Sequence, residues 1–211
     1  MKICSACACL WLTAFVIGTA TAQTVAENTL GTYSQNLTSS FYVGQSFTTA
    51  NDGTADLLGT IYLLTSGGSA SGSGTLYLFS SAYPGTASNL STTTTNLLGS
   101  AIWNSSSNFW DLSAANITLN AGAQYFFYVA PTADLNFGFG STNGSDAVDL
   151  YAGGEYYVSP PPSDNPFFSQ PSDLDFRVTG TAVPEPSTYA AVLGVMALGI
   201  GLLKRRAGGQ A

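Results

Sequence analysis

The chemistry open to this chain is limited first by the residues that it lacks. It has no histidine, its three cysteines all lie among the first nine residues, and residues 23–181 contain no lysine. These absences exclude Ser-His-Asp and Cys-His nucleophilic catalysis, lysine Schiff bases and ordinary zinc or copper sites from that body. Carboxylates are therefore the side chains left for catalysis or strong metal binding.

Carboxylates in the second half of the body could support glycoside hydrolysis. That reaction needs two carboxyl groups that face each other across a cleft. No spacing in the sequence singles out such a pair, so we predict a non-enzymatic protein and keep a carboxylate-dependent glycoside hydrolase as an alternative. The residues that could supply the pair are Asp149, Glu155, Asp164, Asp173 and Asp175.

The same acidic cluster could bind calcium, which takes six to eight oxygen ligands from carboxylates and carbonyls. The residues follow neither an EF-hand nor a nonapeptide repeat. The alternative is that these are solvated loop carboxylates, and that Arg177, the only cation of the body, pairs with a neighbouring acid. We predict no cofactor, with calcium as the single candidate. Its candidate ligands are Asp146, Asp149, Asp173 and Asp175.

Aromatic residues near loops suggest a second kind of site, because exposed rings stack on sugar faces in carbohydrate-binding modules. Prolines make residues 159–172 a loop, and two adjacent rings cannot both point inward along an extended chain. An exopolysaccharide is therefore a candidate partner. The alternative is that the rings belong to the core. The candidate glycan contacts are Trp110, Phe167 and Phe168.

The charge of the body argues against nucleic acid as a partner. Eleven acidic residues in residues 23–181 face a single basic one, so the body carries about −10 while the whole chain carries −7. The other basic residues lie in the segments before and after the body. Such a body repels polyanions, which leaves nucleic acid and anionic surfaces as poor partners.

Short runs of alternating apolar and polar residues predict that strands position these side chains. Glycine-, serine- and proline-rich turns separate the runs, and the body shows no sustained helical period. We predict an all-β fold, a single β-sandwich of jelly-roll type over residues 23–181. In the first run, Phe41, Val43, Gln45 and Phe47 would share one face. The predicted strands are 41–49, 57–64, 75–80, 97–103, 123–130, 147–151 and 173–180.

Residues 1–22 are typical of a secretory signal peptide. Lys2 precedes an apolar centre, and Ala20 and Ala22 form an A-x-A cleavage site before Gln23. This segment would be a helix that is removed on export, and a retained N-terminal anchor is the alternative. The cysteines would leave with it, so no disulfide would stabilise the mature body.

The C-terminal segment predicts a membrane helix. Tyr189–Leu203 carries no charge, and as a helix it would rise about 22 Å against a hydrocarbon core of about 30 Å. We assign a linker to residues 182–187, a transmembrane helix to 188–203 and a cytoplasmic tail to 204–211. The basic residues favour the cytoplasmic side, so the body would lie outside; a buried core helix is the alternative. These basic residues are Lys204, Arg205 and Arg206.

The same tail resembles the PEP-CTERM sorting signal of Gram-negative bacteria. The resemblance rests on the triplet Pro184, Glu185 and Pro186, on the short apolar run that follows, and on the terminal basic cluster. It implies that an exosortase, a membrane-embedded cysteine transpeptidase, recognises the triplet and processes the tail. The implied partners are this sorting enzyme, the export machinery and the inner membrane.

The body resembles the choice-of-anchor surface domains, β-sandwich modules that occur with various anchoring tails. That family implies no defined biochemical activity. The sequence therefore predicts an exported, non-enzymatic protein with a C-terminally membrane-anchored precursor and a mature form at the cell surface or in the extracellular matrix. The runs that carry the resemblance are Gln45–Thr49, Leu76–Phe79, Pro84–Thr86, Leu119–Tyr125 and Asp175–Val178.

Overall fold

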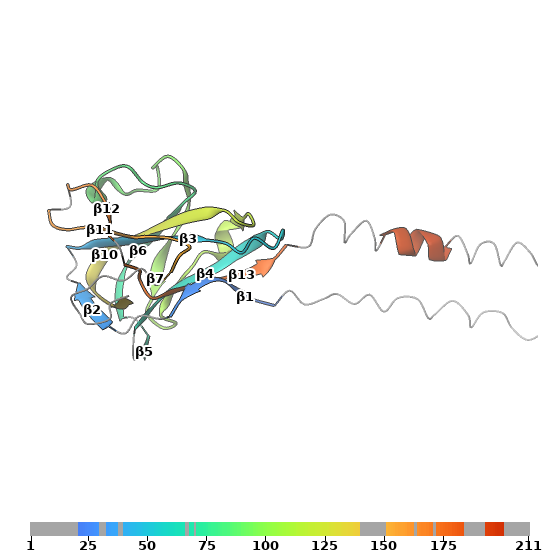
Figure 1. Ribbon diagram of the computed structural model, residues 1–211, viewed down its shortest axis with the longest axis horizontal. Coiled ribbons are helices and arrows are strands. Elements are labelled where there is room, and N and C mark those ends of the chain that lie inside the picture. Colours follow the sequence, from blue (N-terminus) through green and yellow to red (C-terminus); the bar gives the residue numbers. More distant parts are fainter. Residues whose placement is uncertain are drawn as a thin grey trace, which may run out of the picture.

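The computed structural model describes residues 21–29, 33–37, 40–65, 68–69, 71–139, 151–162, 164–170, 172–183 and 193–200. In this part the regular secondary structure is antiparallel β-strand except for two 3-10 turns and one helix over residues 193–200 (Figure 1). The all-β prediction for the body is thereby confirmed.

The described part of the chain contains strands, two 3-10 turns and one helix. The 3-10 turns η2 (Ala87–Asn89) and η3 (Ser113–Ala115) lie between strands. The strands are β1 (Gln23–Asn28), β2 (Tyr33–Leu37), β3 (Tyr42–Thr48), β4 (Asp56–Thr65), β5 (Gly68–Ser69), β6 (Ser71–Phe79), β7 (Leu97–Asn104), β8 (Phe109–Asp111), β9 (Thr118–Leu119), β10 (Gln124–Phe139), β11 (Tyr156–Ser159), β12 (Phe168–Gln170) and β13 (Phe176–Ala182).

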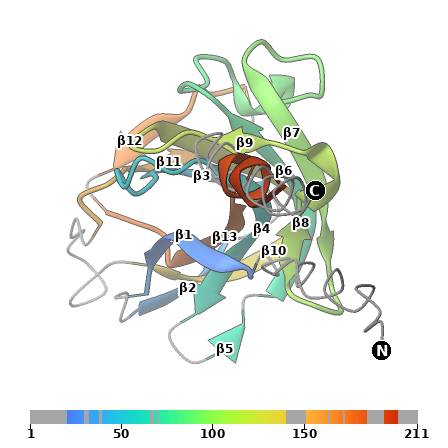
Figure 2. The ribbon, with the colours of Figure 1, turned by 90° about the vertical axis from the view of Figure 1, so that its right-hand side faces the viewer.

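The described strands join into one sheet that curls on itself (Figure 2). Its order is β1-β13-β4-β8-β7-β6-β10-β3-β11-β12, with β2 beside β10 and both β5 and β9 beside β4. The long strand β10 pairs with β3 on one side and with β6 on the other. Curling encloses the inner face of the sheet, which carries the main hydrophobic core.

Alternation along the strands decides which side chains enter this core. On β3, Val43 and Phe47 are fully buried in the inner core, as predicted, and Phe41 packs against its margin. Gln45 lies between them and is also fully buried. Burial of so many large apolar side chains stabilises a body that has no cysteine, each contributing about 1.5–3 kcal/mol.

Most of the predicted strands coincide with observed ones, and several observed strands were not predicted. The predicted runs 41–49, 57–64, 75–80, 97–103, 123–130 and 173–180 correspond to β3, β4, β6, β7, β10 and β13. The predicted run 147–151 lies outside the described residues except for Tyr151, which is not in a strand. The strands β2, β8, β11 and β12 are short, so a period of two residues is hard to detect in them, and burial along β1 does not alternate because the strand contains an irregularity between Thr24 and Ala26.

The first and last strands of the body are neighbours. β1 pairs with β13, with Gln23 opposite Gly180, and both chain ends leave the sheet on the same side (Figure 1). At this end the Gln23 amide donates a hydrogen bond to the Asp56 carboxylate (2.6 Å), and the Val183 N–H donates to the Ala55 carbonyl (2.8 Å). The two points where the chain enters and leaves the body are therefore held together.

The segments beyond this end are described only in part. The predicted membrane span 188–203 is represented by the helix over residues 193–200, whose apolar side chains are mostly exposed. Among the described residues, no helix is long and apolar enough to cross a membrane. Residues 1–20, and with them Ala20, lie outside the described part, as do 184–192 and 201–211.

Candidate functional site

Trp110 is a core residue, and its prediction as a glycan contact is wrong. Its side chain is fully buried on β8, with its ring centroid 4.5 Å from that of Trp103 on β7. The indole N–H donates to the Gly74 carbonyl (3.2 Å), which satisfies its one polar group. A ring enclosed in this way cannot stack on a sugar at the surface.

The adjacent residues Phe167 and Phe168 belong to opposite faces of the sheet. Phe168 lies on β12 opposite Val158, which packs against the inner core, and the phenylalanine remains 44% exposed because β12 is an edge strand. Phe167 instead packs against Tyr128, with ring centroids 4.6 Å apart. The structure therefore does not unite the three predicted glycan contacts, and only Phe167 joins an aromatic surface.

That surface is a second cluster on the outer face of the sheet, which we call the outer aromatic cluster. It is built on β3, β6, β10 and β11 and is completed by the loops before β7 and before β12. Its centre is fully or nearly buried, and its margin is partly exposed. The buried members are Phe79, Leu90, Phe126 and Tyr128, and the partly exposed members are Tyr42, Tyr77, Tyr83, Leu97, Tyr157 and Phe167.

Strand register explains why these rings meet. Tyr128 on β10 stands opposite Tyr77 on β6 and Gly44 on β3, and Gly44 stands opposite Tyr157 on β11. A Cβ at Gly44 would lie 2.5 Å from the Tyr128 ring. The glycine thus lets Tyr128 lie over β3, where its ring centroid is 5.7 Å from that of Tyr157.

Burial holds the central ring, Tyr128, in its neutral form, although one hydrogen bond to its hydroxyl acts in the opposite direction. The Tyr83 N–H donates to the Tyr128 hydroxyl (3.1 Å). Burial raises the pKa of Tyr128 well above its ordinary value, because the charged phenolate would lose its solvation. Burial, followed by the nearby Glu155 carboxylate, also raises the pKa of Tyr157. Tyr128 and Tyr157 are therefore uncharged phenols at physiological pH.

A polar group borders the cluster at the start of β11. The Tyr157 hydroxyl donates to the Glu155 carboxylate (3.4 Å), and the Glu155 N–H donates to the Ser46 hydroxyl (2.8 Å). Glu155 is exposed and so is Asp164, which accepts a hydrogen bond from Ser88 (3.1 Å). Of the candidate carboxylates for hydrolysis that the structure describes, these two are exposed, and Asp149 lies outside the described residues.

The other acidic residues occupy a different environment. Asp173 and Asp175 are 1% and 2% exposed, so the interpretation of these two as solvated loop carboxylates is wrong. Gln45 donates to one Asp173 oxygen (2.8 Å) and the Tyr151 N–H donates to the other (2.9 Å), while Gln45 accepts from the Leu174 N–H (2.9 Å). This network connects β3 to the segment that enters β13.

The structure places only half of the candidate calcium ligands. Asp146 and Asp149 lie outside the described residues. Within the described ranges, no group of three or more histidine, cysteine or acidic side chains is arranged to hold a metal ion. Asp173 accepts hydrogen bonds from neutral protein groups on both of its carboxylate oxygens. Calcium binding thus stays a prediction.

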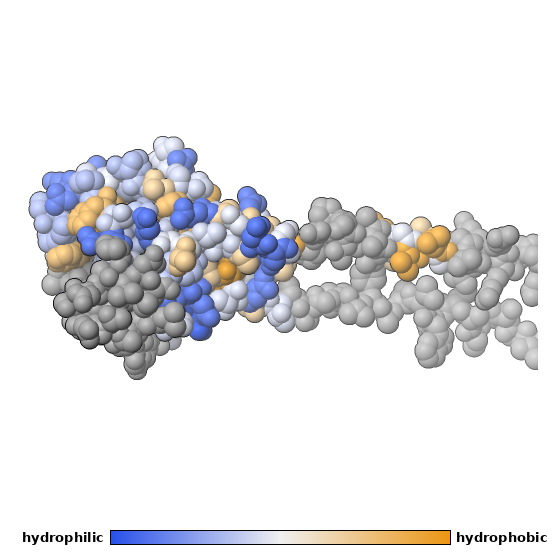
Figure 3. Space-filling model, in the orientation of Figure 1, coloured by the Kyte–Doolittle hydropathy of each residue, from blue (hydrophilic) through white to orange (hydrophobic). Residues whose placement is uncertain are grey.

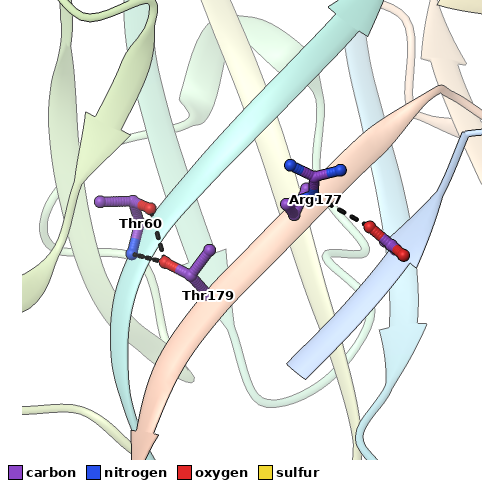
Figure 4. Close-up of polar contacts among 4 residues, drawn as sticks. Thr60, Arg177 and Thr179 are labelled. Atoms are coloured by element: carbon purple, nitrogen blue, oxygen red, sulfur yellow. Dashed lines mark hydrogen bonds and ion pairs between the residues drawn. The ribbon is translucent and has the colours of Figure 1, made fainter. Parts of the chain in front are cut away.

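The single cation of the body pairs with a strand neighbour rather than with these acids. Arg177 on β13 contacts Glu27 on β1 at 2.9 Å, and Thr179 shares a 2.7 Å hydrogen bond with Thr60 on β4 (Figure 4). Both charged side chains are more than 40% exposed. These contacts connect adjacent strands at the polar surface and do not enclose a site.

The described body is thus an all-β domain with a curled antiparallel sheet, an inner hydrophobic core and an outer aromatic cluster. No protein-family model, curated protein or solved structure matches this chain.

Proposed function

We propose that this chain is the precursor of an exported, non-enzymatic protein of the cell surface or extracellular matrix. The precursor crosses the inner membrane by the export machinery, stays anchored by its C-terminal segment with the body outside the cytoplasm, and is then processed by an exosortase-type enzyme. The triplet Pro184, Glu185 and Pro186, with the basic residues Lys204, Arg205 and Arg206, forms the sorting signal.

The observation that carries this proposal is the pairing of β1 with β13. Both targeting segments leave the body at one end, and Ala22 and Gln23, which flank the proposed signal cleavage bond, are exposed there. Loss of residues 1–22 and of the tail would remove no strand of the described sheet. The body would remain folded through both processing steps, and its far end would point away from the membrane.

The composition and surface of the body support an extracellular location. Its surface in the view of Figure 3 is mostly polar, with a few small apolar patches. Its stability does not depend on disulfides or on a reducing environment, because the body has no cysteine. In finer detail, we assign the curled antiparallel sheet to a β-sandwich of jelly-roll type, in which layers of strands enclose the inner core.

Substitution of the sorting triplet tests this function. We expect the wild-type protein to be recovered from the cell surface or the medium. The variant Pro184→Ala with Pro186→Ala should accumulate in the membrane fraction, because its tail is no longer recognised. The neighbouring substitution Ser187→Ala is the matched control and should be sorted normally. Equal release of the wild type and the triplet variant would contradict the proposal.

A further inference from the structure

The outer aromatic cluster leaves part of its ring surface exposed to solvent. Five of its partly exposed members are aromatic and surround the buried Tyr128. Tyr83 and Phe167 come from two different loops, and their ring centroids are 6.2 Å apart. Both rings also contact Tyr128, at 6.0 Å and 4.6 Å between centroids. Tyr83 and Phe167 therefore hold each other in place over Tyr128, so a ligand would not have to order these two rings.

The spacing of the exposed tyrosines can be obtained from the strand register. Tyr42 lies two residues along β3 from Gly44, and Gly44 and Tyr77 both stand opposite Tyr128. Strands are about 4.8 Å apart and rise about 3.4 Å per residue, so the Cα atoms of Tyr42 and Tyr77 are separated by roughly 12 Å. By the same geometry Tyr42 and Tyr157 are separated by roughly 8 Å. These spacings suit an extended, repeating ligand that contacts several rings at once.

Two of these tyrosines keep their hydroxyls unengaged. Tyr83 donates to the Thr86 carbonyl (3.2 Å) and Tyr157 donates to Glu155. The hydroxyls of Tyr42 and Tyr77, in contrast, make no hydrogen bond within the described part of the chain. In the same row, Ser100 is the neighbour of Tyr77 and Ser169 is the neighbour of Tyr157. The face thus offers apolar ring surfaces with neutral hydroxyl groups beside them.

Charge selects among the ligands that could use such a face. The only cation of the body, Arg177, is on β13, which belongs to the other half of the sheet. The described acids beside the cluster, Glu155 and Asp164, stand at its margin. A net charge of about −10 on the body repels acidic polymers. A neutral chain with apolar faces and many hydroxyl groups meets all of these conditions.

We propose that the outer aromatic cluster binds a neutral polysaccharide, with Tyr42, Tyr77, Tyr157 and Phe167 as contact residues. The rings stack on the apolar C–H faces of successive sugars, and the tyrosine hydroxyls donate to sugar oxygens. The proposal rests on the proposed function only in that the protein must meet polysaccharide outside the cytoplasm. The glycan contacts are thus assigned to tyrosines of β3, β6 and β11, and no longer to Trp110 and Phe168, which the sequence predicted.

Affinity electrophoresis of the exported protein tests this proposal. The gels would contain hydroxyethylcellulose, laminarin or dextran as neutral polymers and alginate as an acidic one. We expect retardation by at least one neutral polymer and none by alginate. No retardation by any neutral polymer would overturn the proposal. Retardation by alginate alone would also overturn it, because it would show that charge rather than ring stacking drives binding.

Variants locate the binding face. Tyr42→Ala with Tyr77→Ala should weaken binding roughly tenfold or more, because exposed aromatic anchors dominate such contacts. The matched control is Tyr62→Ala, which removes a partly exposed tyrosine that contacts Phe109 away from the cluster. Its binding should stay within about twofold of the wild type. A loss in Tyr62→Ala equal to that in the double variant would contradict the assignment.

A second, more conservative double variant keeps the proposal testable if the double alanine variant fails to fold. Tyr42→Phe with Tyr77→Phe keeps both rings and removes only hydroxyls that have no partner in the described chain. Its melting temperature should be unchanged while binding weakens severalfold, and unchanged binding would contradict the role of the hydroxyls. Analytical sedimentation without polysaccharide tests whether a second copy of the chain covers this face instead. A wild-type dimer that becomes monomeric in Tyr42→Ala with Tyr77→Ala would show that it does, and would overturn the glycan proposal.

The result can be separated from the proposed function. A protein that is sorted to the surface but binds no neutral polymer would contradict only the glycan proposal. A protein that binds such a polymer but remains at the membrane with an intact tail would contradict only the sorting proposal.

Discussion

The two faces of the same strands are covered in different ways. On β6, Leu76 and Leu78 point to the inner core and are fully buried, while Tyr77 and Phe79 point to the outer aromatic cluster. The inner face is enclosed by the curl of the sheet, whereas the outer face is covered only in part by two loops. We therefore expect the inner core to account for most of the stability, while the outer cluster keeps partly exposed rings that are accessible to a ligand.

The largest effect is expected from a cavity in the inner core. Phe47 is fully buried and contacts Tyr125, Phe127 and Phe176, with centroids 5.8, 6.4 and 6.3 Å away. Phe47→Ala should lower the free energy of unfolding by about 3–5 kcal/mol, measured by urea denaturation. The control Phe168→Ala, at an exposed edge, should cost much less. Equal losses of unfolding free energy in the two variants would contradict the claim that enclosed rings stabilise the fold more than exposed ones.

A steric change at Gly44 should damage the outer cluster selectively. In Gly44→Ala the new methyl group would meet the Tyr128 ring at 2.5 Å and the Phe127 carbonyl at 2.7 Å. We expect a loss of about 1–3 kcal/mol in urea denaturation, because the ring must move from its packed position. Gly59→Ala on β4 is the milder control, because its methyl group would lie 3.3 Å from the nearest Thr179 atoms. A neutral Gly44→Ala would show that Tyr128 is loosely packed.

A smaller loss of stability is expected when only the hydroxyl of Tyr128 is removed and its ring is kept. Tyr128→Phe removes the acceptor of the Tyr83 N–H and should cost about 1 kcal/mol at neutral pH. Its pH dependence is more specific. The unfolded tyrosine ionises near pH 10, while burial raises the folded pKa, so the folded state keeps a proton that the unfolded state releases.

Stability should therefore be complete below about pH 10 and should fall as pH rises further. Tyr128→Phe should show a shallower fall than the wild type in urea denaturation at alkaline pH. A part of the fall should remain, because burial also raises the pKa of Tyr156 and Tyr157. Identical slopes in the two proteins would mean that Tyr128 is ionised in the fold as readily as in the unfolded chain.

The smallest effect is expected outside both clusters. Arg177→Gln breaks the exposed ion pair with Glu27 and should cost no more than about 0.5 kcal/mol, with the difference decreasing as salt is added. A cost above that of Gly44→Ala would show that the β1–β13 edge depends on this pair. Stability would then depend on an exposed ion pair as well as on the two clusters.

Sequence alternation predicted which residues of β3 share one face of the strand. On β3 the residues Val43, Gln45 and Phe47 share the buried face, as expected from their spacing. Gln45 is acceptable there because Asp173 and Leu174 satisfy its amide. That partnership could not be predicted, since the two segments are more than a hundred residues apart and no local pattern connects them.

The candidate site was harder to predict. Trp110 lies on a strand of three residues, too short to show alternation, and its burial depends on Trp103 across the β7–β8 hairpin. The tyrosines of the outer cluster did carry a signal. Phe126, Phe127 and Tyr128 are consecutive on β10, so rings must point to both faces, and an outer cover is required. Which loops supply that cover depends on the tertiary fold.

Intact-mass spectrometry of the protein released from the cell surface tests the central claim most directly. We predict a polypeptide that begins at Gln23 and ends within or close to residues 184–186, with every strand from β1 to β13 retained. Recovery of a surface protein that still contains the apolar run and residues 204–211 would contradict processing. The tail would then be a permanent membrane anchor.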